Sequence, residues 1–441
     1  MGWLGIFRMG LVQASLGAIV VLTTSTINRV MVVELMLPAM LPGALVALHY
    51  FIQLSRPSFG YASDRLGRRT PWIIGGMTIL AIGGVLAALA TALMADSRLL
   101  GTLLAVVAFI LIGGGVGAAG TSMLALLAAQ VPAERRAAAG SIVWIMMITG
   151  FVVTSATAGA FLDPFTTTRL VEVTACVAVI AWTVTVLALT GVEIRQQPRS
   201  LPASDAAQAP QASFRTSLRE VWSDLEARQF TVFVFVSMLA YSTQDLILEP
   251  YGGFLFGMTP GETTSLSGLQ HGGVFIGMLI VGIFGSLLAK RWPGILRLFI
   301  VSGCLTSGLA LALLSLSTSF APAWPLAANI VFLGVANGAF AVAAIGCMMT
   351  LAGADGKNRE GIRMGVWGAA QAIAFGLGGF MGTVLIDLAR AVTGDIALSY
   401  AVVFAAEAAL FVISALIASQ IGITRQTAQT GWAASQTPFQ T

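Results

Sequence analysis

The chain is built largely of apolar runs that are each long enough to cross a lipid bilayer. Each run holds about 20 residues, the length an α-helix needs to span the hydrocarbon core. Apolar residues make up 57% of the chain and charged residues only 10%. Because the runs lack the alternation of a membrane β-barrel, we predict an all-α polytopic membrane protein with twelve transmembrane helices. Their expected ranges are 11–35, 40–62, 71–94, 99–129, 139–161, 170–192, 230–250, 263–290, 295–317, 325–351, 362–388 and 398–421.

Matching residues recur in the two sets of six runs at a nearly constant spacing. The only two histidines, His49 and His271, lie 222 residues apart, and Trp144 and Trp367 lie 223 residues apart. Transporter-type bundles are often built from such repeats, and their substrate sites lie near the bilayer midplane between the repeats. We therefore expect two pseudo-symmetric six-helix halves with a functional site between them.

The loops divide the chain and orient it in the membrane. We expect six-helix halves at 1–194 and 229–422, separated by a cytoplasmic linker at 195–228 that contains an amphipathic surface helix. A polar tail at 423–441 is expected to be disordered. Most of the 23 Lys and Arg residues fall in loops on one side of the membrane. By the positive-inside rule, both termini are therefore expected in the cytoplasm.

No residue pattern in the sequence points to catalysis. We find neither a nucleophile–base–acid set nor a metal-ligand spacing, so we expect neither an enzyme nor a metal centre. The string from Gly115 to Gly120 matches a dinucleotide motif, but no strand precedes it and it lies within an apolar run. Close helix packing explains it better. The net charge of +4 is a topology signal, and we expect no nucleic-acid partner.

Charged residues near the outer ends of the first run in each half would be costly to bury in lipid, so we expect them at a functional site. Arg29 stands in the first half where Asp245 stands in the second, and we expect the two to pair across a central cleft. The alternative is a latch between the halves without a substrate role. Other polar residues expected at the cleft are Glu34, Gln244, Glu249 and Gln270.

A loop rich in glycine and arginine follows the second run and reads GYASDRLGRR. It resembles the GxxxDRxGRR signature of the major facilitator superfamily, and the resemblance implies the fold of that superfamily. The arginines are expected to anchor at anionic lipid headgroups. The residues that match the signature are Gly60, Asp64, Arg65, Gly67, Arg68 and Arg69.

Three longer segments carry a more specific resemblance: LTTSTINRVMVVELMLPAMLPGALVALHY, YSTQDLILEPYGGFLFGMTPGE and LSGLQHGGVFIGM. They are similar to segments of the PucC/LhaA family, the bacteriochlorophyll-delivery branch of the major facilitator superfamily in phototrophic bacteria. The resemblance implies a role in assembling light-harvesting antenna complexes in the bacterial inner, intracytoplasmic photosynthetic membrane. Implied partners are antenna polypeptides, bacteriochlorophyll, membrane lipid, and reaction-centre or pigment-synthesis proteins.

The resemblance makes the paired histidines candidate ligands of the bacteriochlorophyll magnesium, because a neutral imidazole nitrogen is a good axial ligand. His271 is the better candidate, since Gly272 and Gly273 beside it clear space for a bulky ligand. The alternative is that each histidine only hydrogen-bonds a neighbouring helix. Aromatic residues expected to pack against the pigment are Trp144, Trp367 and Tyr241.

Three hypotheses of function remain open at this point. The protein binds or delivers bacteriochlorophyll during antenna assembly, or it holds antenna polypeptides as a chaperone without touching pigment. The third is a proton-coupled secondary transporter of a small amphipathic solute that works through Asp245, Glu34 or Glu407.

Overall fold

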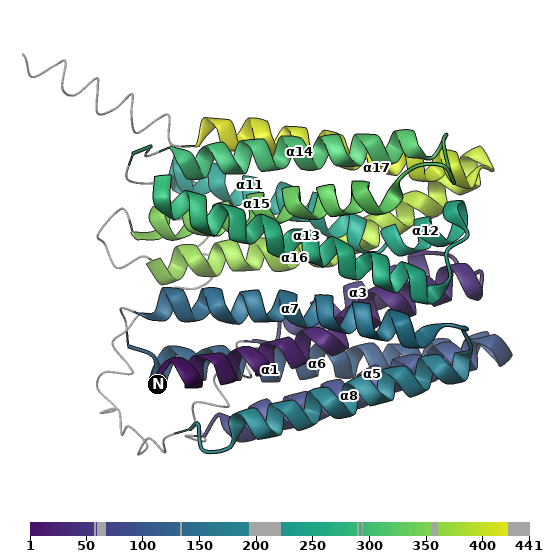
Figure 1. The fold of residues 1–441 in the computed structure, drawn as a ribbon, viewed down its shortest axis with the longest axis horizontal. Helices are drawn as coiled ribbons and strands as arrows, with labels where there is room; N and C mark the ends of the chain where they lie inside the picture. Colours follow the sequence, from purple (N-terminus) through teal and green to yellow (C-terminus); the bar gives the residue numbers. More distant parts are fainter. Residues whose placement is uncertain are drawn as a thin grey trace, which may run out of the picture.

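Long helices that run side by side make up the molecule (Figure 1). In the computed structural model the described residues are 1–56, 59, 68–132, 135–193, 222–288, 291–292, 294–353 and 360–421. Within these ranges eleven helices are long and apolar enough to cross a membrane, and the shorter apolar helix α3 occupies the second position in the chain. The prediction of an all-α, multi-pass membrane protein is confirmed.

The described residues of the first half form six helical segments. The first starts as α1 (Trp3–Val21) and continues to Glu34, and the second half likewise opens with a segment in two pieces, α11 and α12. The remaining helices of the first half are α3 (Met40–Gln53), α5 (Thr70–Asp96), α6 (Arg98–Gln130), α7 (Arg136–Leu162) and α8 (Thr167–Leu189). Those of the second half are α11 (Leu225–Asp245), α12 (Leu248–Phe256), α13 (Pro260–Leu288), α14 (Ile295–Ser317), α15 (Leu326–Gly353), α16 (Glu360–Thr393) and α17 (Ile396–Gln420).

Local sequence signals set where several helices begin. The side chain of Asp224 accepts hydrogen bonds from the first-turn amides of α11, and Asp395 does the same for α17. Such caps satisfy amides that have no partner within the helix. A proline at the start of α5 costs nothing there, since the amide it lacks would be unpaired.

The first helical segment of each half is irregular at a similar point. In the first half, two turns of wide π-helix, η1 (Leu22–Thr26) and η2 (Val30–Glu34), flank the short α2 (Ile27–Arg29). In the second half, the helix breaks between α11 and α12 at Leu246 and Ile247. Irregular turns of this kind often mark functional positions in membrane helices.

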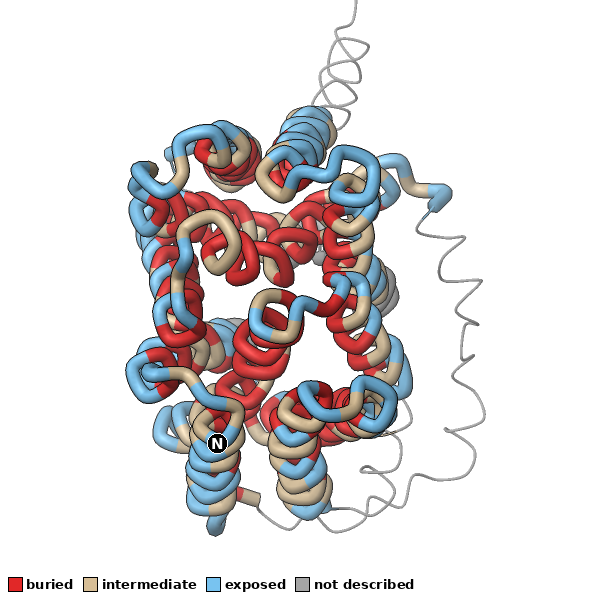
Figure 2. The backbone as a smooth tube through the Cα atoms, turned by 90° about the vertical axis from the view of Figure 1, so that its right-hand side faces the viewer, coloured by how far each residue is buried: buried red, intermediate tan, exposed pale blue. Residues whose placement is uncertain are grey.

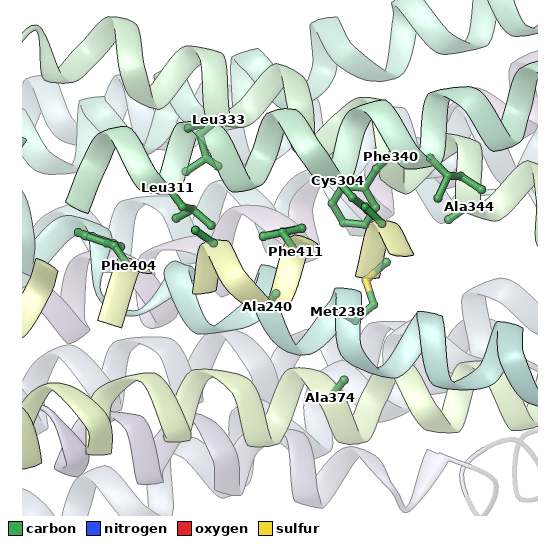
Figure 3. Close-up of a cluster of buried hydrophobic side chains, with 14 of the residues drawn as sticks. Met238, Ala240, Cys304, Leu311, Leu333, Phe340, Ala344, Ala374, Phe404 and Phe411 are labelled. Atoms are coloured by element: carbon green, nitrogen blue, oxygen red, sulfur yellow. The ribbon is translucent and has the colours of Figure 1, made fainter. Parts of the chain in front are cut away.

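Each half packs around its own buried core. The second-half core is rich in aromatic residues, and Figure 3 shows Phe340, Phe404 and Phe411 pointing among Leu311, Leu333 and Cys304. In the end-on view of Figure 2, buried residues face the middle of the bundle and exposed residues face outward. Many outward residues are large and apolar, such as Leu103, Ile283 and Leu388, each more than half exposed. This surface is suited to lipid.

Two helix pairs hold the halves together: α7 packs on α13, and α3 packs on α16. At one end of the bundle, α12 also contacts α2 and η2. We call this end, where α3 begins and α12 lies, the outer end, after the orientation expected from the positive-inside rule, and we call the opposite end the arginine-rich end. The linker helix predicted within 195–228 and the tail at 423–441 lie mostly or wholly outside the described residues.

Candidate functional site

The seam between α7 and α13 depends on glycine. A Cβ atom on Gly159 of α7 would lie 2.3 Å from the hydroxyl of Ser265, and one on Gly261 of α13 would lie 2.5 Å from the carbonyl oxygen of Gly159. These positions therefore admit no larger side chain without moving a helix. The two halves meet here through backbone contact, as small residues allow in membrane helices.

Hydroxyl and amide groups join the first helical segment to the second half at the same end. The hydroxyls of Thr26 and Thr264 lie 3.0 Å apart, and those of Ser25 and Ser267 lie 3.5 Å apart. Asn28 donates a 2.7 Å hydrogen bond to the carbonyl oxygen of Leu246, at the break between α11 and α12. All of these side chains are buried, so this junction is a polar layer within an apolar bundle.

The start of α3 is held by the other half. The carboxylate of Asp387 on α16 accepts hydrogen bonds from the backbone amides of Ala39, at 3.1 Å, and Met40, at 2.7 Å. One turn away, Gly43 lies directly against Thr383 of α16. The first turn of α3 is thus capped across the seam.

The predicted pair between Arg29 and Asp245 is not formed. Arg29 is 1% exposed and forms an ion pair with Glu34, five residues further along its own segment. Its guanidinium also donates to the carbonyl oxygen of Met258 at 2.6 Å and lies against Gly253, both in the second half. Arg29 therefore spans the seam, but its acidic partner comes from its own half.

Asp245 lies instead among aromatic side chains. It is half-buried, and it interacts electrostatically with Tyr50 and Tyr241. The rings of Tyr50 and Tyr241 both contact Phe375, with centroids 5.8 Å apart in each pair. Glu407 of α17, 1% exposed, also lies near Asp245, and neither of its carboxylate oxygens has a hydrogen-bond partner among the described residues.

Of the remaining polar residues expected at the cleft, Gln244, Glu249 and Gln270 are buried and Glu34 is not, and the four do not form one hydrogen-bonded group. Glu34 is partly exposed and bound to Arg29. Gln244 and Glu249 are 0% and 3% exposed, and the side-chain polar atoms of both lack partners in the described part of the chain. Gln270 is 5% exposed, and its backbone carbonyl approaches Gly334 of α15 closely.

His49 has its lone pair occupied. Arg56 donates to the amide oxygen of Gln53, which fixes the amide orientation, so the amide nitrogen of Gln53 donates to Nε2 of His49 at 2.8 Å. The ring proton must then lie on Nδ1, which is buried without a partner among the described residues. In this arrangement His49 offers no free nitrogen to a metal ion.

His271 has the opposite arrangement. Its Nδ1 lies 2.8 Å from the carbonyl oxygen of Ser267, which can only accept, so Nδ1 carries the proton. Among the described residues, Nε2 has no hydrogen-bond partner, so its lone pair is free, as in histidines that bind metals through one nitrogen and donate to a carbonyl through the other. The ring meets Phe151 of α7 edge-on at 4.9 Å. A Cβ atom on the adjacent Gly272 would meet nothing within 4 Å.

The three aromatic residues expected to line a pigment site lie in different environments. Trp144 is 43% exposed on α7. Trp367 is 1% exposed in the second-half core, where its indole nitrogen donates to Thr231 at 3.0 Å and its ring packs against Phe230. Trp367 therefore does not face the seam. Tyr241 is half-buried beside Phe340 and Phe375.

Most of the arginine-rich loop lies outside the described residues, namely Gly60, Asp64, Arg65 and Gly67. Its last part is fastened by Glu193, which follows α8. The Glu193 carboxylate accepts from the backbone amides of Arg69, at 2.6 Å, and Thr70, at 2.9 Å. Partial burial alone would raise the pKa of Glu193, but these hydrogen bonds and the nearby charge of Arg68 outweigh it and hold the pKa below its ordinary value.

Several residues of the seam were not expected from the sequence. Gln53 and Arg56 follow His49 by four and seven residues, which places all three on one helical face. The chain of hydrogen bonds from Arg56 through Gln53 to His49 could therefore have been predicted. Asp387 and the hydroxyl pairs carried no such signal, because their partners lie hundreds of residues away in the chain.

The arrangement of helices matches solved transporters. A crystal structure of the peptide transporter POT in complex with sulfate aligns with a TM-score of 0.69 at 14% identity, covering 97% of this chain and 96% of that one. A D-xylose-proton symporter aligns with the same TM-score at 14% identity, covering 94% and 97%. The protein is thus a multi-pass membrane protein with the major facilitator fold.

Within that class, the chain belongs to the PUCC protein family, whose profile matches residues 26–426. It is 50% identical over 432 residues to the bacteriochlorophyll synthase 44.5 kDa chain of Rhodobacter capsulatus, covering 97% of this chain and 98% of that one. It is 28% identical to protein PucC of Cereibacter sphaeroides, covering 93% and 90%. The predicted family is therefore confirmed.

Proposed function

We propose that this protein takes part in the assembly of bacterial light-harvesting antenna complexes, by binding or delivering bacteriochlorophyll, by holding antenna polypeptides, or by both. Membership of the PUCC protein family supports this proposal. So does the name of the relative at 50% identity, which refers to bacteriochlorophyll. The proposed location is the bacterial inner membrane, with both termini in the cytoplasm. Antenna polypeptides and reaction-centre or pigment-synthesis proteins are the proposed partners.

The pigment-binding form of the proposal rests on the environment of His271. Its hydrogen bond to Ser267 fixes the tautomer and leaves Nε2 free, and Gly272 leaves open space beside it. These features fit an axial ligand for a bacteriochlorophyll, which would supply a magnesium ion with one open coordination position. His49 does not fit in the same way, since Gln53 occupies its Nε2. Of the two predicted ligands, we therefore retain His271 as the ligand and assign His49 a structural role.

The first test is an absorption spectrum of detergent-purified protein from phototrophic cells, with wild type beside His271→Ala and His49→Ala. The proposal expects near-infrared bands that co-purify with wild type and with His49→Ala and that vanish with His271→Ala. Bands that survive both substitutions would overturn the assignment of the ligand. A colourless wild-type protein that still pulls down antenna polypeptides would leave only the chaperone form of the proposal.

A second candidate function is a proton-coupled secondary transporter of a small amphipathic solute. Asp245 and Glu407 favour it, because ionisable residues at membrane depth often belong to proton or substrate pathways. The fold is also that of solved transporters. This reading expects solute uptake to fall when Asp245→Asn or Glu407→Gln is introduced, whereas antenna assembly in the same cells would be unaffected. Loss of assembly without any measurable uptake would exclude it.

A further inference from the structure

The polar layer at the outer end contains more hydrogen-bonding capacity than its own residues use. Glu249 lies in the first turn of α12, just after the break at Leu246 and Ile247, and is 3% exposed. Both of its oxygens lack a hydrogen-bond partner among the described residues, as do both polar atoms of Gln244 and the amide oxygen of Asn28. Buried polar atoms are nearly always paired, so unpaired ones at one place call for an explanation.

Oxygen atoms gather around the Glu249 carboxylate. The hydroxyls of Ser25, Thr263 and Ser267 face it from η1 and α13, although none reaches hydrogen-bond geometry with its oxygens. The π-turn η1 and the break before α12 interrupt the regular helices beside this carboxylate. A carboxylate with hydroxyls and the ends of interrupted helices is the kind of donor set that holds Na⁺ or a proton in membrane transporters.

The side chains around Glu249 carry a net negative charge, which a bound Na⁺ or proton would neutralise. Arg29 on α2 is the charged group that acts on Glu249 from a neighbouring element. Its positive charge is already matched by the ion pair with Glu34 on η2. The three side chains together leave one negative charge in a buried layer, where an uncompensated charge is costly. The start of α12 stabilises that negative charge only in part.

We propose that Glu249, with Ser25, Thr263 and Ser267, forms a binding site for one monovalent cation, either Na⁺ or a proton on the carboxylate, at the junction of the two halves. Occupancy neutralises Glu249 and stabilises the contact between the two halves at the outer end, since the site is built from both halves. The site is distinct from His271 and does not depend on pigment binding.

The test is the melting temperature of the purified full-length protein in detergent, at constant ionic strength, with NaCl against choline chloride and from pH 6 to pH 9. If Na⁺ is the occupant, the melting temperature rises saturably with Na⁺, by about 3 °C or more, and choline has no effect. If a proton is the occupant, the melting temperature falls as the pH rises, because the folded state then holds a proton that the unfolded state has released. Na⁺ has no effect in that case.

In either case Glu249→Gln should remove the response, because the amide is neutral and of equal size. The matched control is Glu407→Gln, which changes another buried and unpaired carboxylate of the second half and should keep the Na⁺ response. If Glu249→Gln does not fold, the double variant Ser25→Ala with Ser267→Ala should shift the Na⁺ or pH midpoint several-fold. A wild-type melting temperature that depends on neither cation nor pH, or a response that is equal in Glu249→Gln, would overturn the proposal.

Discussion

In the first half, a carboxylate joins the third and sixth helices at the arginine-rich end, whereas in the second half a guanidinium does so. Glu193, after α8, accepts from the backbone amides at the start of α5. In the equivalent place Arg297, in the first turn of α14, donates to the carbonyl oxygen of Ile421 after α17, at 3.3 Å. Both halves therefore join the third helix to the sixth, but the charged residue follows the sixth helix in the first half and lies on the third helix in the second half. The helix arrangement repeats, and the chemistry that fastens it does not.

The same difference extends to membrane depth. The first half contributes the buried Arg29, and the second half contributes the buried acids Glu249 and Glu407. Even the two matched histidines differ, since Nε2 of His49 accepts a hydrogen bond and Nε2 of His271 is free. A repeat thus supplies a symmetric scaffold, and the residues that differ between its halves place Arg29 across the seam and leave a free imidazole nitrogen on one side among the described residues.

The largest effect is expected from Arg29→Met. The substitution leaves Glu34 without its ion-pair partner and removes the positive charge beside Glu249. Breaking a fully buried pair from one side costs about 3–5 kcal/mol of stability, and the loss here should lie near the lower end because Glu34 is partly exposed and screened by solvent. A large fall in the melting temperature of the purified protein would show this effect.

The double variant Arg29→Met with Glu249→Gln sharpens that prediction. If the two halves attract through these charges, the second substitution should recover part of the loss, because it removes the uncompensated acid. Arg98→Met, which changes an exposed arginine, is the control and should leave the melting temperature almost unchanged. Equal stability of the single and double variants would show that Arg29 acts without Glu249.

A smaller effect is expected from Gln53→Leu. The substitution removes the acceptor of Arg56 and the donor to His49, and it replaces the amide by an apolar side chain of similar size. The loss should be about 1–3 kcal/mol, since Nε2 of His49 would then be buried without its hydrogen bond. Gln420→Leu, on an exposed face of α17, serves as the control for the amide-to-leucine change. No substitution can do the same to His271, because its acceptor is a main-chain carbonyl.

The smallest effects are expected at these two contacts of the arginine-rich end, and only one of them should depend on pH. The pKa of Glu193 is held below its ordinary value of 4.5. Its contribution to stability is therefore complete above pH 4.5 and is lost as the pH falls through the lower pKa of the folded state. Glu193→Gln should make the melting temperature depend less on pH in this acid range. Unchanged acid dependence in the variant would show that other carboxylates dominate.

Arg297→Met is the counterpart in the second half. Its single long hydrogen bond predicts a loss of about 0.5–1 kcal/mol. The loss should be the same at pH 4 and pH 7, because arginine keeps its charge throughout. A loss that changes with pH would indicate that the two contacts are coupled rather than independent.

The sequence was sufficient for the fold because membrane helices are set by the length of apolar runs. The expected range 295–317 coincides with α14, and the other helices differ from their predicted ranges mainly at the ends. The largest differences are at the end of α3, which stops at Gln53 rather than at residue 62, and at the start of α1, which begins at Trp3 rather than near residue 11. Its first turns carry Arg8 among apolar residues, so a window of hydropathy alone did not extend to them.

The partners of individual polar residues were less predictable, and Arg29 shows why. Each π-turn adds a residue to a helical turn and so rotates everything beyond it by about 100°. Two such turns flank Arg29, and nothing in the sequence announced them. The rotation decides which side of the segment faces the second half, and hence that Arg29 meets Glu34 and Met258 rather than Asp245. Trp367 is a similar case, since a core position and a seam position look alike in an apolar run.

The cap that Asp387 provides to α3 makes the folding of one helical turn depend on the distance between the two halves. If the outer end opens, the amides of Ala39 and Met40 lose their acceptors together. A cap of this kind contributes about 0.5–2 kcal/mol, so the first turn of α3 would fray in the open form. The hydrogen-exchange rate of these two amides would then report how often the outer end opens.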